Sequence, residues 1–350
     1  MYSQDVETLE VVVAQLDECR SLIERDSVTA LRMALILADN VAEVIMANKI
    51  ENMLPFNPIY ENYVRTVEQY PSAFDEEEQV NEARSKYIDK KTRREIERDF
   101  GKKVYFLTDR GFIDPPVAAS LHKLHKYRSE AYHQGRVREG NLPQAVRIYF
   151  DLDCALLEDF DKPSPIVGKL WGLQELMESM PTVMRYSAAE SKELRFAVNP
   201  SPSAVARSLS FTVQLDLVTL REDLAIYLRS QVDQIDSEMD FCLEYGHFLF
   251  ANWKNADMIP MAYVLKDMET GGRALSLEEM RGKQFPTKCA DLDRWRTEAS
   301  QLTDICERAT LFANFARIEN ELDPCRDSLR ELASEVDRAY EHRMDLIRGK

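Results

Sequence analysis

Three of the five histidines in the sequence, His122, His125 and His133, lie within a stretch of twelve residues. Arg128 and Ser129 lie between the second and the third of them. A histidine titrates near neutral pH, so it can take a proton from a ribose 2′-hydroxyl or give one to a leaving oxygen. A guanidinium group can bind a phosphate and stabilise negative charge that grows on its oxygens. These side chains therefore suit the binding or the metal-free cleavage of RNA.

The segment around these residues reverses the sign of the charge of the chain. The whole sequence has a formal net charge of −16, which disfavours a polyanion as a ligand of the surface as a whole. Between residues 121 and 138, five basic residues stand against one acidic residue, Glu130. A local reversal of this kind can attract a phosphate backbone. Besides Arg128, the basic residues that we expect to contact RNA are Lys123, Lys126, Arg136 and Arg138.

A helix expected over residues 115–134 places Arg128 among apolar residues. Helical spacing aligns it with Val117, Leu121, Leu124 and Ala131. An arginine in such a position needs a partner, because an unpaired buried charge is costly. Asp39 and Glu43, four residues apart on an otherwise apolar helix, are candidate partners, and so is Asp153. Two interpretations stay open: Arg128 acts at an RNA site, or it only pairs with one of these acids inside the bundle.

The sequence contains an arginine that is followed by a polar residue and, five positions after the arginine, by a histidine. This pattern resembles the motif of the HEPN superfamily. Arg128, Ser129 and His133 fit its Arg-x4-6-His motif. The surroundings are similar too: an apolar first helix with an acid pair, the motif helix LHKLHKYRSEAYHQG, and the amphipathic helix AVRIYFDLDCALLEDF behind it. The resemblance covers roughly residues 25–161 and gives no account of residues 162–350.

The resemblance implies a metal-independent endoribonuclease of a toxin or phage-defence kind. Arg128 and His133 would be its catalytic residues, contributed by both protomers of a homodimer, with Ser129, Asp39 and Glu43 in support. Positions five apart differ by about 140° in direction on an ideal helix. One helix cannot easily aim both groups at one phosphate, so a second copy would help to complete the site.

The alternative is a non-catalytic HEPN-like RNA-binding or helical adaptor protein, because many members of the family do not cleave RNA. The tyrosine that some toxin relatives carry two residues after the histidine is here Gly135, so regulation by modification of that tyrosine is not supported. Whether the chain is an enzyme stays open at this point.

No metal or cofactor is expected. His122 and His125 are three residues apart, but no further acid or cysteine has a convincing spacing around them. The six cysteines form no Cys-x-x-Cys pair, which excludes a standard zinc knuckle and favours a reducing compartment. The acidic N-terminus lacks a signal-peptide layout, and the most apolar stretch, residues 31–46, is too short to span a bilayer. We therefore expect a cytoplasmic protein without a membrane segment.

The composition predicts an all-α fold, and the resemblance implies that a HEPN-like helical bundle precedes a second bundle of long helices. Glycine (11) and proline (14) are scarce in 350 residues, so few tight turns are available. Ser27 should cap a central buried helix that ends near Pro55, and Asn57-Pro58 should begin a helix to about Tyr70. Residues 74–107 are predicted to form one charged helix. Its residues Lys90, Lys91, Arg93 and Arg94 form either a solvated face or a basic arm near a nucleic-acid site.

The main boundary is expected at the sequence DKPSP, residues 161–165. It separates a HEPN-like domain, residues 1–161, from a helical domain, residues 162–350, that would serve dimerisation or the docking of a protein partner. In the second domain we expect helices over 167–181, over 203–245 and from 287 onward, with 182–202 irregular. Residues 259–285 predict a loop or a small hairpin, and Pro324 should kink or split the last helix.

Overall fold

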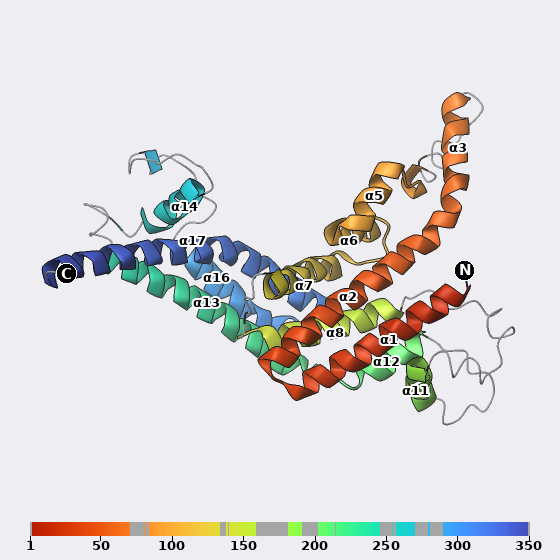
Figure 1. Cartoon of the computed structure of the whole chain (residues 1–350), viewed down its shortest axis with the longest axis horizontal. Helices are drawn as coiled ribbons and strands as arrows, with labels where there is room; N and C mark the ends of the chain where they lie inside the picture. Colours follow the sequence, from red (N-terminus) through yellow and green to blue (C-terminus); the bar gives the residue numbers. More distant parts are fainter. Residues whose placement is uncertain are drawn as a thin grey trace. The chain divides into compact units, whose positions relative to one another are not determined.

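The computed structural model describes residues 2–70, 81, 84–133, 138, 140–158, 181–190, 202–213, 215–245, 254, 257–269, 279–280 and 290–348. Within these ranges every regular element is helical, so the prediction of an all-α fold is confirmed (Figure 1). The chain divides into two compact units, Met1–Leu215 and Asp216–Lys350. No helix among the described residues is both long enough and apolar enough to cross a membrane.

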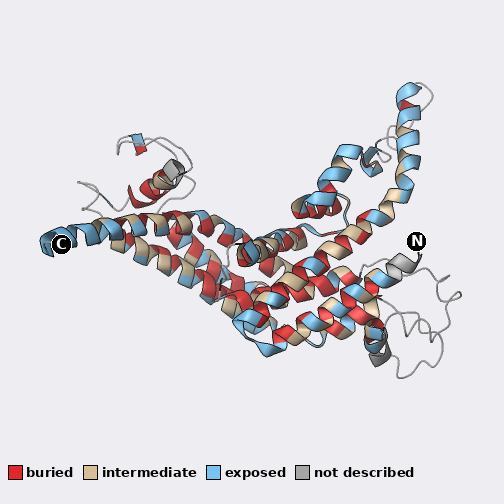
Figure 2. Ribbon diagram, in the orientation of Figure 1, coloured by how far each residue is buried: buried red, intermediate tan, exposed pale blue. Residues whose placement is uncertain are grey.

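The first unit is a bundle built around α2. Its helices are α1 (Tyr2–Arg25), α2 (Val28–Met53), η1 (Leu54–Phe56), α3 (Asn57–Gln69), α5 (Lys90–Arg98), α6 (Phe100–Asp109), α7 (Pro115–His133), α8 (Leu142–Glu158), α11 (Pro181–Glu190) and α12 (Pro202–Ser210). Ser27 caps α2 as predicted, because its hydroxyl accepts a hydrogen bond from the backbone N–H of Ala30 at 3.2 Å. Helices α1, α6, α7 and α8 all pack on α2, whose buried residues cover much of its circumference (Figure 2).

Helix α1 is an element that the sequence analysis did not predict. It contacts α2 over most of its length, and its buried residues follow a helical spacing of three and four. Those with no exposed surface are Leu9, Val12, Val13, Leu16 and Cys19. The spacing was the available signal; of the acidic residues between these positions, Glu18 is exposed, whereas Glu10 and Asp17 contact α11.

The prediction of one charged helix over residues 74–107 is wrong where the structure describes this segment. Asp89 caps α5 by accepting a hydrogen bond from the N–H of Thr92 at 2.7 Å, and Asp99 caps α6 through the N–H of Lys102 at 2.8 Å. Asp99 has an extended backbone, so it ends α5 and begins α6. Residues 71–80, 82 and 83 lie outside the described residues.

Asn57 holds the segment before α5 rather than capping α3. It is the first residue of α3, which ends at Gln69 as predicted. Its side-chain amide donates to the carbonyl of Ile88 at 2.9 Å, and its side-chain oxygen accepts from the N–H of Ile88 at 2.7 Å. Both backbone groups of Ile88 are therefore satisfied by one side chain, which positions α5.

The first unit extends beyond residue 161, where the sequence analysis placed the domain boundary. Glu10 of α1 accepts hydrogen bonds from the N–H groups of Thr182 and Val183, at 2.9 and 3.0 Å, and so caps α11. Helix α12 packs on α8 and α11. The prediction of irregular structure over 182–202 is thus wrong for α11, while the linker at 161–165 and the helix expected over 167–181 lie outside the described residues, apart from Pro181.

The second unit contains α13 (Leu217–Tyr245), α14 (Met258–Glu269), α16 (Ala290–Gln301), η5 (Leu302–Asp304) and α17 (Arg308–Arg348). The two long helices α13 and α17 pack against each other, which confirms a second bundle of long helices. The helix expected over 203–245 is two helices, because Asp216 caps α13 by accepting from the N–H of Val218 at 3.1 Å.

Two expectations for the rest of the second unit differ from the structure. Residues 258–269 form α14 and not a loop or hairpin; residues 270–278 and 281–289 lie outside the described residues. Pro324 does not split α17, which continues through it.

Replacement of Asn57 by alanine should loosen α5 from α3. The substitution removes two hydrogen bonds and leaves the N–H of Ile88 without its partner, and an unsatisfied buried group costs about 1–3 kcal/mol. Hydrogen exchange should show faster exchange at Ile88 and in α5. Asn62→Ala, on the same helix, is the control and should leave the exchange of α5 unchanged. Equal exchange in Asn57→Ala and the wild type would show that Asn57 does not hold α5 in place.

Candidate functional site

Asp39 is the polar centre of the first unit. Its side chain is only 1% exposed in the middle of α2. The hydroxyl of Tyr149 on α8 donates a hydrogen bond to Asp39 Oδ1 at 2.9 Å, and Nδ1 of His125 on α7 lies 2.8 Å from the same oxygen. Nε of Arg128 lies 3.2 Å from Asp39 Oδ2. Side chains of α7 and α8 thus converge on one carboxylate.

Arg128 forms an ion pair with Asp39, one of the partners that its position predicts. Its Nε has no hydrogen bond of acceptable geometry within the described part of the chain, so the contact with Asp39 is electrostatic rather than directional. The side chain is 26% exposed. Among the described residues, no hydrogen bond engages the terminal nitrogens of Arg128, which therefore remain able to bind an anion.

Asp153 lies near Asp39 on α8 but does not pair with Arg128 in the described structure. It is fully buried, and neither of its side-chain oxygens has a hydrogen-bond partner among the described residues. Burial, followed by the negative charge of Asp39, raises the pKa of Asp153 well above its usual value of 3.8. A neutral Asp153 allows two carboxyl groups to lie in one interior. Burial, followed by the charge of Asp39, also raises the pKa of Tyr149 well above 10.0, which keeps its hydroxyl a donor.

Glu43 does not reach Arg128 in the structure. Its Oε1 accepts a hydrogen bond from Nζ of Lys103 on α6 at 2.7 Å, and the side chain of Lys103 is 6% exposed. The two acids on α2 therefore have different neighbours, because Asp39 is directed to α7 and α8 and Glu43 to α6.

His122 and His125 face α6. The His125 ring stacks on Phe100 with the ring centroids 4.1 Å apart and the planes at 4°. His122 lies beside Gly101, where an added Cβ would stand 3.2 Å from His122 Cε1. Partial burial, followed by the charge of His125, lowers the pKa of His122. Among the described residues no group of histidine, cysteine and acidic side chains is arranged to hold a metal ion.

Tyr132 brings the two residues of the motif to the same edge of α7. The guanidinium carbon of Arg128 lies 5.0 Å from the centroid of the Tyr132 ring, and the His133 ring meets the same ring edge-on at 4.9 Å. Tyr132 is 58% exposed, and His133 is exposed at the last residue of α7. Ser129 is half-buried. Arg128, Tyr132 and His133 form what we call the α7 edge.

The other basic residues expected to contact RNA differ in their placement. Lys123 is 1% exposed and lies over the Tyr127 ring, inside the bundle and away from any surface that RNA could reach. Arg138 is held by both oxygens of Glu130, at 2.9 Å each. Lys126 is exposed. Arg136 lies outside the described residues.

Sequence reasoning missed Tyr132 and Tyr149, the two tyrosines that complete the geometry. Tyr149 precedes Asp153 by four residues, a helical neighbour that could have linked it to the acids. Tyr132 had no signal beyond its place next to His133. Arg32 of α2, which donates a hydrogen bond to the carbonyl of Ala131, was also missed.

The chain matches no protein-family model, no curated protein and no solved structure.

The raised pKa of Asp153 predicts a pH-dependent gain in stability for Asp153→Asn. The unfolded protein ionises this group above pH 3.8 while the folded protein keeps it neutral. The free energy of unfolding of the wild type therefore falls as the pH rises from 3.8 toward the folded-state pKa. The variant does not show this decrease, because asparagine does not ionise. Urea denaturation at several pH values should show that the free energy of unfolding of the variant, relative to that of the wild type, increases from acidic to neutral pH. Asp109→Asn, at an exposed position of α6, is the control, and a difference between Asp153→Asn and wild type that does not change with pH would contradict the prediction.

Proposed function

We propose that the first unit is a HEPN-like domain that binds RNA at the α7 edge. The observation that carries the proposal is the state of Arg128. Asp39 holds the Nε side of its guanidinium, and its terminal nitrogens have no hydrogen bond to any described residue. The ion pair with Asp39 and the Tyr132 ring restrict the guanidinium, so it has less side-chain entropy to lose when its terminal donors bind a phosphate.

The neighbours of Arg128 support RNA as the ligand. Tyr132 exposes an aromatic ring on which an unpaired base can stack, and RNA recognition relies largely on such stacking in single strands. Lys126, an exposed residue two positions before Arg128, adds a positive charge to α7. The order of an acid-bearing helix, a motif helix and an amphipathic helix behind it resembles the HEPN superfamily in the same segment.

Tyr132→Ala should weaken the binding of single-stranded RNA by roughly tenfold, since the stacking of one base contributes about 1–3 kcal/mol. Fluorescence anisotropy with a labelled uridine oligomer at low salt measures the effect. Tyr105→Ala is the matched control, because Tyr105 is an exposed tyrosine on α6 away from Arg128. A wild-type protein that does not bind the oligomer would overturn the proposed function.

Metal-independent cleavage of RNA is a second candidate, favoured by the position of Arg128 and His133 against one tyrosine ring. His133 is exposed and so can exchange protons with a substrate. Nε of Arg128 is directed toward Asp39, and positions five apart on a helix differ by about 140° in direction. A homodimer that pairs two α7 edges would place the histidine of one protomer opposite the arginine of the other.

If the chain cleaves RNA, His133→Ala should lower the rate in the presence of a chelator by at least about a hundredfold and leave RNA binding in place. His342→Ala, at an exposed histidine of α17, should keep the wild-type rate. A mixture of the inactive Arg128→Ala and His133→Ala proteins should recover part of the activity if two protomers share the site. Intact RNA after incubation with the wild type would rule out cleavage and leave RNA binding as the function.

A further inference from the structure

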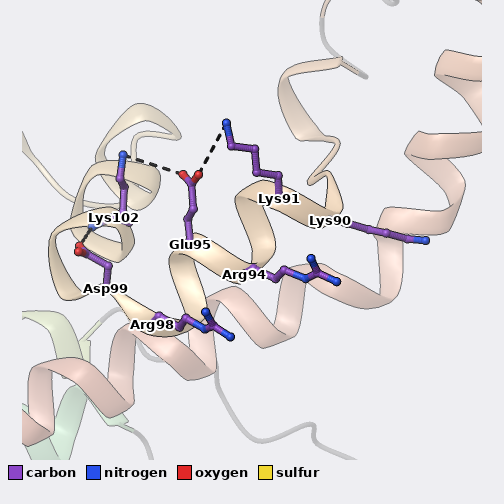
Figure 3. A pocket seen from close by; sticks show the side chains of 7 residues that line it. All are labelled: Lys90, Lys91, Arg94, Glu95, Arg98, Asp99 and Lys102. Atoms are coloured by element: carbon purple, nitrogen blue, oxygen red, sulfur yellow. Dashed lines mark hydrogen bonds and ion pairs between the residues drawn. The ribbon is translucent and has the colours of Figure 1, made fainter.

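Helix α5 exposes three basic residues that are aligned along one side of the helix. Lys90, Arg94 and Arg98 are four residues apart and therefore lie on one side of the helix. All three are exposed, and none has an ion pair with another described residue. Figure 3 shows their side chains extending to the same side of α5. We call these three residues the α5 row.

The other basic residues around α5 have acidic partners. Nε of Arg93 lies 2.9 Å from Glu97, while Nζ of Lys91 and Nζ of Lys102 lie 3.9 and 4.0 Å from Glu95. In Figure 3 Lys91, Glu95 and Lys102 gather on a different side of α5 from the α5 row. The helix thus separates its paired charges from its unpaired ones.

This separation works against the stability of a short helix. Like charges four residues apart destabilise a helix by about 0.2–0.5 kcal/mol per pair, and the α5 row contains two such pairs. The chain has 61 acidic against 45 basic residues, so acidic partners are plentiful, yet none of the described acidic residues forms an ion pair with the row. A binding role accounts for a feature that folding alone disfavours.

The α5 row lies in the same unit as the α7 edge and is joined to α7 through α6. Asp99 connects α5 to α6, and α6 packs on α7, with Gly101 next to His122. The row borders a surface hollow of about 510 Å³, which is lined by five basic and two acidic side chains from α5 and the start of α6. An excess of positive charge therefore surrounds this hollow.

We propose that the α5 row binds the phosphate backbone of single-stranded RNA and extends the binding surface beyond the α7 edge; this inference rests on the proposed function. The helix rises about 6 Å between successive members of the row, a spacing that lets each cation meet a different phosphate of one extended strand. Contacts to phosphate carry no sequence information, so the row contributes affinity and not sequence preference.

An anionic membrane is a less suitable ligand for this surface. A helix that lies on a membrane needs apolar side chains to enter the lipid. The single apolar residue of α5, Ile96, is only 3% exposed and packs into the unit. The exposed surface of α5 is therefore charged and presents no apolar side chain that could enter a lipid layer.

The test compares two double variants with the same change in net charge on the same helix. Arg94→Gln/Arg98→Gln removes two members of the α5 row, and Lys91→Gln/Arg93→Gln removes two paired cations. The affinity for a uridine oligomer is measured as a function of salt concentration. The first variant should lower the slope of log K against log salt by about 1.4, since each phosphate contact of a single strand contributes about 0.7. The second should retain the slope of the wild type, and circular dichroism checks that both are folded.

The outcomes separate this inference from the proposed function. Binding of the oligomer by the wild type, weakened by Tyr132→Ala, supports the function whatever the α5 variants do. An unchanged slope in Arg94→Gln/Arg98→Gln would then overturn the role of the α5 row alone. Equal losses in the two double variants would also overturn it, because they would reflect net charge. Binding of the wild type to vesicles of anionic lipid but not to the oligomer would overturn both proposals.

Discussion

The arrangement of the first unit depends on the carboxylate of Asp39 in the interior of α2. A lone charge at such a depth would be costly, and the structure surrounds it with His125, Arg128 and Tyr149. The buried Leu121 and Leu124 orient the apolar side of α7 toward the bundle. The contacts of Asp39 with His125 and Arg128 add polar constraints on the same rotation, and so they help to determine which residues of α7 face water.

Two acids on one helix position different neighbours. Asp39 contacts α7 and α8, whereas Glu43, one turn later, holds Lys103 of α6. Asp153 can lie close to Asp39 because its raised pKa keeps it neutral, so the interior carries one fewer negative charge than the sequence suggests. Helix α6 packs on both α2 and α5, so it lies between the buried polar groups of α2 and the charged surface of α5.

The strongest local signals in the sequence predicted their structures well. The cap at Ser27, the helix expected from residue 115 and the pairing of Arg128 with an acid of α2 followed from spacing and from the cost of a buried charge. The division of the charged segment at Asp99 did not, because its residues favour a helix on both sides and only the extended backbone of Asp99 separates them.

The placement of the site residues was harder to predict than the helices that carry them. A lysine is normally taken as a surface residue, yet Lys123 is buried with its charge over Tyr127, since a long aliphatic stem packs like an apolar side chain. The contact of Glu10 with α11 joins residues 172 positions apart, and it has a consequence for synthesis. During translation, α1 to α8 emerge well before α11 and α12, so the surfaces that these later helices cover on α1 and α8 stay open to water. The nascent chain therefore completes this core late, and over that interval chaperones and neighbouring nascent chains compete with folding for the exposed apolar surface.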